Sequence, residues 1–443
     1  MWTRIAKVLL TVVGVVAVLM GVLWLWASHR DKVVQQAWAV SRYGSLGALP
    51  TRFPTTPANP QALRLEELAS RLGLDLVPRW VKVGRRRGGG ANHRLPFANV
   101  EQAAKDNAIG QLARADDRIA PAPQELAAFL AQQERGLSAL RQTLISDGAP
   151  QWEMAFDKGF EAPIPNLLGI FDLQFLLIAD ALEQARADNQ AAAAQSLEAS
   201  WQLNAGLWRR PELISQLIAV ASATLQAGAA RRIQLPAVWA TRFEKLDPLA
   251  GFLDAFAGEA WAMRDALNTR GIPEIKRALD GLPLWVPINR PWLMLSTASH
   301  NEAMLRLVSY LAERPLCSVD FVAPSPVFAP HFPAWDIIGT IAWPNMQKTA
   351  ARILRLQLDL ELSARVLRLR SAQQADGRWP SELPGAASRA CPRANWAYRV
   401  NADGTAALSF AGKLPAWPKE PQRLKLPFEH VLGSPTAAPT SGQ

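Results

Sequence analysis

The strongest candidates for chemistry in this chain of 443 residues are acidic residues on one predicted helix. Asp172 lies within residues 167–178, which are otherwise almost wholly apolar, and it shares a helical face with Asp180 and Glu183. Burial would raise the pKa of Asp172, which suits a general acid. The commoner role of such an acid is a core ion pair with an arginine of a neighbouring helix. Asp172 is therefore the candidate catalytic residue, but we expect it to form a structural ion pair instead.

The familiar catalytic and metal-binding signatures are missing from the sequence. It has no phosphate-binding Gly-x-x-x-x-Gly-Lys-Ser/Thr, no His-Glu-x-x-His, no Gly-x-Ser-x-Gly and no Ser-x-x-Lys. Its five histidines are scattered and give no spacing typical of a metal site. The sequence therefore predicts no cofactor and no metal, and it favours a non-enzymatic role.

The only two cysteines are Cys317 and Cys391. They could form a disulfide if the body of the protein lies in an oxidising compartment. Two unrelated buried thiols are an equally good interpretation. The sequence leaves both open.

A basic segment follows the first predicted helix of the body. No acidic residue occurs between positions 76 and 100, whereas six cations do: Arg79, Lys82, Arg85, Arg86, Arg87 and Arg94. They could contact anionic lipid headgroups or an acidic protein, although a solvated loop is the simpler interpretation. Nucleic acid is not an expected partner, because we place the body outside the cytoplasm.

The N-terminus predicts a membrane anchor. Residues 8–27 contain no charge, and twenty residues of helix cover about 30 Å, the thickness of the hydrocarbon layer. Leu25-Trp26-Ala27 is a poor signal-peptidase site, so we expect an uncleaved helix. A very short N-terminal tail usually stays in the cytoplasm. We therefore expect a single-pass protein of the bacterial inner membrane with its body facing the periplasm.

The body is predicted to be mainly α-helical. An apolar fraction of 49% with 19% charged residues indicates a folded protein, and alanine, leucine, arginine and glutamine favour helix. Residues 165–187, 190–207 and 211–232 form three helical patterns with short connections, which imply antiparallel packing. Residues 181–207 resemble one tetratricopeptide (TPR) hairpin.

Changes in composition divide the chain. We predict an anchor (1–32), a linker (33–60), a helical body (61–314), a connector rich in proline and aromatic residues (315–345), a long helix with a small α+β module (346–433) and a disordered tail (434–443). The connector could be a docking groove or a membrane-contacting lip, although a cover over the helical core is the simpler interpretation. Residues 396–400 and 406–410, joined by Asn-Ala-Asp-Gly, predict a β-hairpin.

The C-terminal segment resembles type II secretion pseudopilins. A long helix leads into residues 376–383, Asp-Gly-Arg-Trp-Pro-Ser-Glu-Leu, and Tyr398, Asp403-Gly404 and Gly412 stand where pseudopilins have a tyrosine, an Asp-Gly and a late glycine. The N-terminus lacks the pilin cleavage site and its acidic residue, and about 300 residues intervene. Residues 384–393 contain no acidic ligand, so calcium is not implied.

The same C-terminal segment, together with Pro-Glu-Leu-Ile-Ser at residues 211–215, resembles uncharacterised bacterial membrane-anchored helical proteins. That resemblance implies no activity. Because helical repeats present extended surfaces without polar catalytic clusters, we expect a scaffold or adaptor for other envelope proteins. The alternatives are a hydrolase or lyase acting on an envelope polymer and a membrane protein that engages anionic lipid. The sequence does not predict an oligomeric state.

Overall fold

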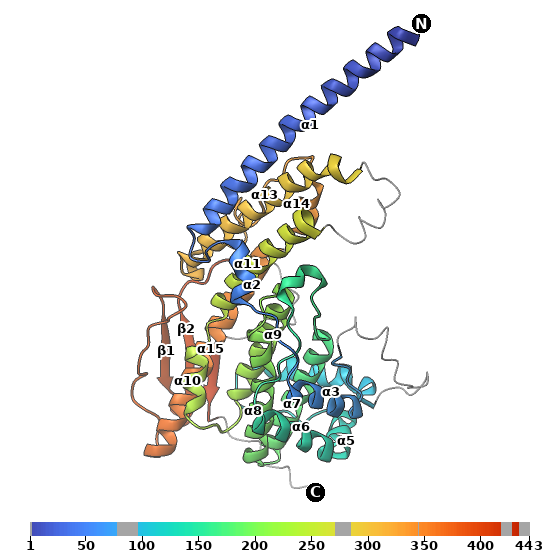
Figure 1. Cartoon of the computed structure of the whole chain (residues 1–443). Helices are drawn as coiled ribbons and strands as arrows, with labels where there is room; N and C mark the ends of the chain where they lie inside the picture. The colour runs from blue at the N-terminus through green and yellow to red at the C-terminus, as the bar shows by residue number, and fades with distance from the viewer. Residues whose placement is uncertain (1, 78–95, 271–284, 344, 418–427, 434–443) are drawn as a thin grey trace.

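The computed structural model describes residues 2–77, 96–270, 285–343, 345–417 and 428–433. Helices form most of this structure, and a small antiparallel sheet lies near the C-terminal end of the chain (Figure 1). The predicted mainly α fold is confirmed.

The N-terminal helix projects from the body (Figure 1). Helix α1 (Trp2–Ala39) is long and apolar enough to cross a membrane, and its apolar side chains between positions 5 and 19 are exposed. Helix α9 (Leu213–Ala230) passes the same test of length and composition, but 72% of it is buried inside the body. Burial identifies α9 as a core helix, so α1 is the element that fits a membrane anchor.

The second half of α1 belongs to the folded body. Ala27, Val34 and Trp38 are buried, and the indole N–H of Trp38 donates a hydrogen bond to the carbonyl of Asn301, 3.1 Å away in α13 (Trp285–Ala312). Residues 33–60, expected as a linker, contain the end of α1, a short 3₁₀ turn (Leu46–Ala48) and α2 (Leu49–Arg52). Their buried leucines pack into the core, which a free linker would not do.

The three predicted central helices are present as α7 (Leu167–Arg186), α8 (Gln190–Trp208) and α9. Ser200 of α8 donates a hydrogen bond to Gln174 of α7, and Gln226 of α9 donates to Ser200. This order of partners makes the three helices antiparallel. Around them lie α3 (Pro60–Arg71), α4 (Glu101–Leu112), α5 (Gln124–Gln132), α6 (Glu134–Ser146), α10 (Val238–Lys245) and α11 (Pro248–Arg264).

Some helices differ from the sequence pattern. Helix α4 was not predicted because two of its four buried residues are alanines and one is a glutamine, which give little apolar contrast. The helical pattern over 236–269 is divided into α10 and α11. Helix α11 begins after Asp247, whose carboxylate caps it by accepting hydrogen bonds from the backbone N–H groups of Leu249 and Ala250. Pro248 is the first residue of α11, a position that favours proline.

The segment that begins at residue 315 contains only short helices, as its prolines predict: a 3₁₀ turn (Leu316–Ser318) and α14 (Ile337–Ala342). The long helix α15 (Met346–Asp376) follows. It packs against α9 and α10, so it is part of the helical body as well as the start of the C-terminal module.

The sheet has the order β1-β2-β3 and is antiparallel throughout. Strands β1 (Asn395–Val400) and β2 (Ala406–Ala411) form the predicted hairpin. Strand β3 (Glu429–Leu432) was not predicted, since four residues form too short a pattern to identify. One hydrophobic core extends from Val34 in α1 to Leu432 in β3 and so includes parts of the predicted linker, the body and the C-terminal module.

Candidate functional site

Asp172 has a cationic partner in the structure. Its carboxylate lies 2.8 Å from the ammonium of Lys105 in α4, which also contacts Glu101 at 2.5 Å. Burial raises the pKa of Asp172, while the hydrogen bond and charge of Lys105 lower it. The ion pair expected for Asp172 as a structural residue was with an arginine, whereas its partner in the structure is a lysine. The carboxylate therefore lies in a three-residue ion-pair cluster with Lys105 and Glu101.

The other two acids of α7 do not converge on Asp172. Asp180 is almost fully buried and pairs with Arg141 of α6 at 2.6 Å, with Ser196 as a second donor. Glu183 pairs with Arg186 one turn along α7, and this hydrogen bond lowers the pKa of Glu183. The three acids therefore belong to three separate ion pairs, and their shared helical face does not form a catalytic pair.

The remaining sequence candidates are partly described. Cys317 and Cys391 form a disulfide, with their Cα atoms 5.3 Å apart. This bond joins the segment after α13 to the loop before β1. The six cations between Arg79 and Arg94 lie outside the described residues, and so does the predicted disordered tail.

A cleft of about 640 Å³ with several charged lining residues lies between the C-terminal end of α10, the middle of α15 and residues 384–390. We call it the α10–α15 cleft. Its charged lining consists of Glu244, Lys245, Asp247, Glu361, Arg365, Arg368 and Arg389. The sequence analysis did not identify these residues. The available signal was the presence of acids and arginines within the leucine-rich pattern of α15.

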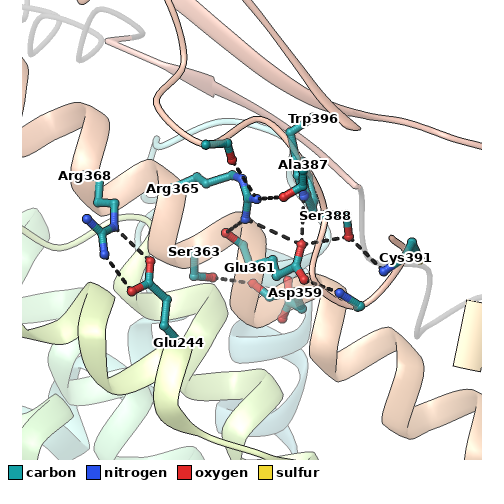
Figure 2. A network of polar contacts seen from close by, with 12 residues as sticks. Glu244, Asp359, Glu361, Ser363, Arg365, Arg368, Ala387, Ser388, Cys391 and Trp396 are labelled. Carbon is teal, nitrogen blue, oxygen red and sulfur yellow. Dashed lines mark hydrogen bonds and ion pairs between the residues drawn. The ribbon is translucent and has the colours of Figure 1, made fainter. Parts of the chain in front are cut away.

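Glu361 is a buried residue of the cleft lining, and Figure 2 shows the polar contacts around it. Its carboxylate accepts hydrogen bonds from the Ser388 hydroxyl (2.9 Å), the Ala390 backbone N–H (2.5 Å) and the Trp396 indole N–H (2.9 Å). Arg365, one turn along α15, lies 3.5 Å away. Four donors around one largely buried carboxylate bind residues 388–396 to α15 and leave Glu361 poorly placed to transfer a proton.

Arg365 holds the same loop through its backbone. Its guanidinium donates to the carbonyls of Gly385 (3.1 Å) and Ala387 (2.6 Å), and it lies over the Trp396 ring, 5.4 Å from the ring centre. Burial lowers the pKa of Arg365. Glu361 and Arg365 therefore hold residues 385–390 of the cleft lining against α15.

The rim of the cleft is charged and accessible. Arg368 and Glu244 form a bidentate ion pair with distances of 2.8 and 2.6 Å. Lys245 and Arg389 are exposed nearby. Within the residues that the structure describes, no group of three His, Cys, Asp or Glu side chains could hold a metal ion. The cleft thus offers charges of both signs, a chemistry suited to a charged polypeptide segment.

A further buried acid, Glu259 of α11, predicts a pH dependence of stability. Burial raises its pKa from 4.5 to about 7, although the Leu213 backbone N–H donates a hydrogen bond to it. Because the folded state holds the proton more tightly, the contribution of Glu259 to stability is fully present below pH 4.5 and is lost as the pH rises through 7, a loss of up to about 3 kcal/mol.

Glu259→Gln removes this ionisation, so the variant is expected to unfold at a higher temperature than the wild type at pH 8 and at a similar temperature at pH 5. Thermal unfolding followed by tryptophan fluorescence measures both. Glu153→Gln, at a side chain that is 48% exposed, is the control and should change neither value. An equal shift of the Glu259→Gln protein at both pH values would contradict the assignment.

Comparison with known protein families finds no match to this chain. Searches among curated proteins and among solved structures also return no significant similarity.

Proposed function

We propose that this protein is a single-pass, membrane-anchored adaptor whose helical body binds a polypeptide partner in the α10–α15 cleft. The anchor is α1, and the body faces the periplasm of a bacterium with the anchor in the inner membrane. The partner is another envelope protein that contributes an acidic segment, which the exposed cations Lys245 and Arg389 of the cleft would bind.

The disulfide and the anchor support this location. A bond between Cys317 and Cys391 is typical of an oxidising compartment. Helix α1 ends in the folded body without a free linker, so the cleft keeps a fixed geometry relative to the anchor. Such a body could hold a partner at a defined distance from the bilayer.

The observation that carries the proposal is that the carboxylates of the cleft already bind groups of the protein itself. Glu361 accepts hydrogen bonds from the loop, and Glu244 binds Arg368 through both oxygens. These two acids shape the site, and the third acid of the lining, Asp247, caps α11 by accepting from the backbone N–H groups of Leu249 and Ala250. The exposed cations Lys245 and Arg389 remain available to a ligand. A hydrolase or lyase needs convergent acids with accessible oxygens, and Asp172 lies in a separate ion-pair cluster.

The test reverses the accessible charges without changing the walls. Full-length protein carrying Lys245→Glu and Arg389→Glu is compared with wild type by cross-linking in intact membranes, purification and quantitative mass spectrometry. Charge reversal at a binding surface should reduce recovery of the partner about tenfold or more.

The matched control reverses two exposed cations outside the cleft, Lys413→Glu and Arg393→Glu. It should retain the partner at the wild-type level. The same partners at the same amounts with both double variants would remove the cleft from the proposal. If no protein is recovered with the wild-type chain in a constant ratio, the adaptor function itself is contradicted.

A further inference from the structure

The contact between α1 and α13 extends into the apolar part of α1. In the helix before Ala27, Met20 and Leu23 are partly covered, whereas the side chains from position 5 to 19 are exposed. Helix α13 is the principal contact of α1. Met20, Leu23, Ala27 and Val34 have the spacing of one helical face, so a single stripe of α1 packs on α13.

This position matters because Met20 and Leu23 belong to the uncharged run 8–27. Met20 precedes Ala27 by seven residues, about 10 Å along a helix. Figure 1 shows the N-terminal, yellow end of α13 directed along α1 towards its free end, with α14 beside it. If residues 8–27 occupy the bilayer, this end of α13 lies at or within the headgroup layer.

The surface found there has the chemistry of a membrane interface. Trp335 is 40% exposed and Ile341 of α14 is 79% exposed. The indole N–H of Trp292 in α13 donates to the Trp335 carbonyl at 2.8 Å, which joins α14 to α13. Arg290 is exposed on α13. Tryptophan, isoleucine and a long cationic side chain are residues that favour the boundary between headgroups and acyl chains.

Among the residues that the structure describes in α14 and the N-terminal end of α13, no acidic side chain, which would oppose this contact, is exposed. Asp336 is the only acidic residue in the sequence from 329 to 343. It is fully buried, and its carboxylate accepts a hydrogen bond from the Gly339 backbone N–H at the start of α14. The described exposed side chains of α14 are Ile341 and Thr340, and the Thr340 hydroxyl donates a hydrogen bond to the Asp336 carbonyl. This surface therefore carries no charge, which agrees with a lipid contact.

We propose that α14 and the N-terminal end of α13 form a second membrane contact, which lies in the interfacial layer beside the transmembrane helix. This contact holds the body in one orientation on the bilayer, since a single helix alone leaves the body free to rotate about its axis. The inference depends on α1 spanning the membrane, and it does not depend on the function of the α10–α15 cleft.

The experiment places a fluorophore at single introduced cysteines in the full-length protein in lipid nanodiscs. The positions are Ile341→Cys in α14 and Trp335→Cys just before it. Both native cysteines are in the disulfide, so labelling of the oxidised protein is specific. Lipids that carry a nitroxide in the headgroup or along the acyl chain then quench a fluorophore according to its depth.

Two further positions serve as references. Val15→Cys, exposed on α1, reports the hydrocarbon layer, and Val238→Cys, 53% exposed on α10, reports the aqueous body. If Ile341 contacts the interfacial layer, headgroup nitroxides should quench the fluorophore at Ile341→Cys strongly. The degree of quenching should lie within about twofold of the largest value measured at any position. Val238→Cys should remain unquenched. Trp335→Cys should behave like Ile341→Cys.

Each outcome decides between the two membrane claims. Quenching at Val15→Cys with none at Ile341→Cys and Trp335→Cys overturns the second contact and leaves the anchor intact. No quenching at Val15→Cys overturns the anchor and, with it, this inference. Cross-linking of Ile341→Cys between two protomers, without lipid quenching, would also overturn the inference by showing that a second copy covers this surface.

Discussion

Glu361→Leu is expected to lower the free energy of unfolding by about 3–5 kcal/mol, since it removes one member of a buried charged network. The variant leaves Arg365 without its nearby carboxylate and leaves the Ser388 hydroxyl and the Trp396 indole N–H without their acceptor. Each uncompensated buried polar group adds to the loss. Urea unfolding of the full-length protein in detergent, followed by tryptophan fluorescence, measures the change.

Two control variants separate this effect from a general effect of charge. Glu361→Gln keeps one acceptor oxygen and should lose clearly less stability than Glu361→Leu. Glu244→Gln removes the partner of Arg368, whose side chain is 54% exposed, so a loss of about 1 kcal/mol or less is expected. A Glu361→Leu protein as stable as Glu244→Gln would show that Glu361 does not hold the loop.

Asp359→Leu is expected to have the second large effect, again about 3–5 kcal/mol. Asp359 of α15 is fully buried and pairs with Arg231 at 2.5 Å, where Ser363 is a second acceptor for the guanidinium. Because the surrounding charges are positive, removing Asp359 should lower the free energy of unfolding more than removing Arg231. Arg232 is buried beside Arg231, and burial together with this repulsion lowers the pKa of Arg232 to about 9.

His430 and Arg370 contribute to the same cluster. The pKa of His430 is held well below its usual range by burial and by the nearby arginines, and burial lowers the pKa of Arg370. Removing Asp359 therefore leaves several buried cationic groups with less compensation. Removing Arg231 instead relieves repulsion, so Arg231→Met should cost less than Asp359→Leu.

The double variant Arg231→Met with Asp359→Leu completes the test. Replacing both members of a buried ion pair by apolar residues of similar size is often nearly neutral, so the double variant should be more stable than Asp359→Leu alone. Urea unfolding of the four proteins gives the coupling energy. Equal and additive losses in the two single variants would rule out the unequal roles assigned to Asp359 and Arg231.

The fold class could be predicted because its signals are local. Composition and apolar spacing identified α7, α8 and α9, and an uncharged run identified α1. The short strand β3 could not be predicted, since it becomes a strand only by pairing with β2. The start of α11 depended on the cap at Asp247, whose position before Pro248 gave a local signal that was not used.

The predicted site residues show the limit of helical periodicity. Asp172, Asp180 and Glu183 share a face of α7, yet each pairs with a different cation: Lys105, Arg141 and Arg186. Spacing along one helix cannot specify which neighbouring helix supplies a partner. The structural role expected for Asp172 agrees with this contact, whereas the identity of the partner could come only from the packing of α4 against α7.

The sequence by itself determined a helical protein with an apolar N-terminal helix and a β-hairpin near its C-terminal end, because composition, charge-free length and turn residues act through near neighbours. Only the tertiary structure placed Glu361 among Ser388, Ala390 and Trp396, brought α13 along the apolar part of α1, and formed the α10–α15 cleft. These arrangements depend on contacts between residues far apart in the chain, and such contacts leave no pattern in the spacing of a single sequence.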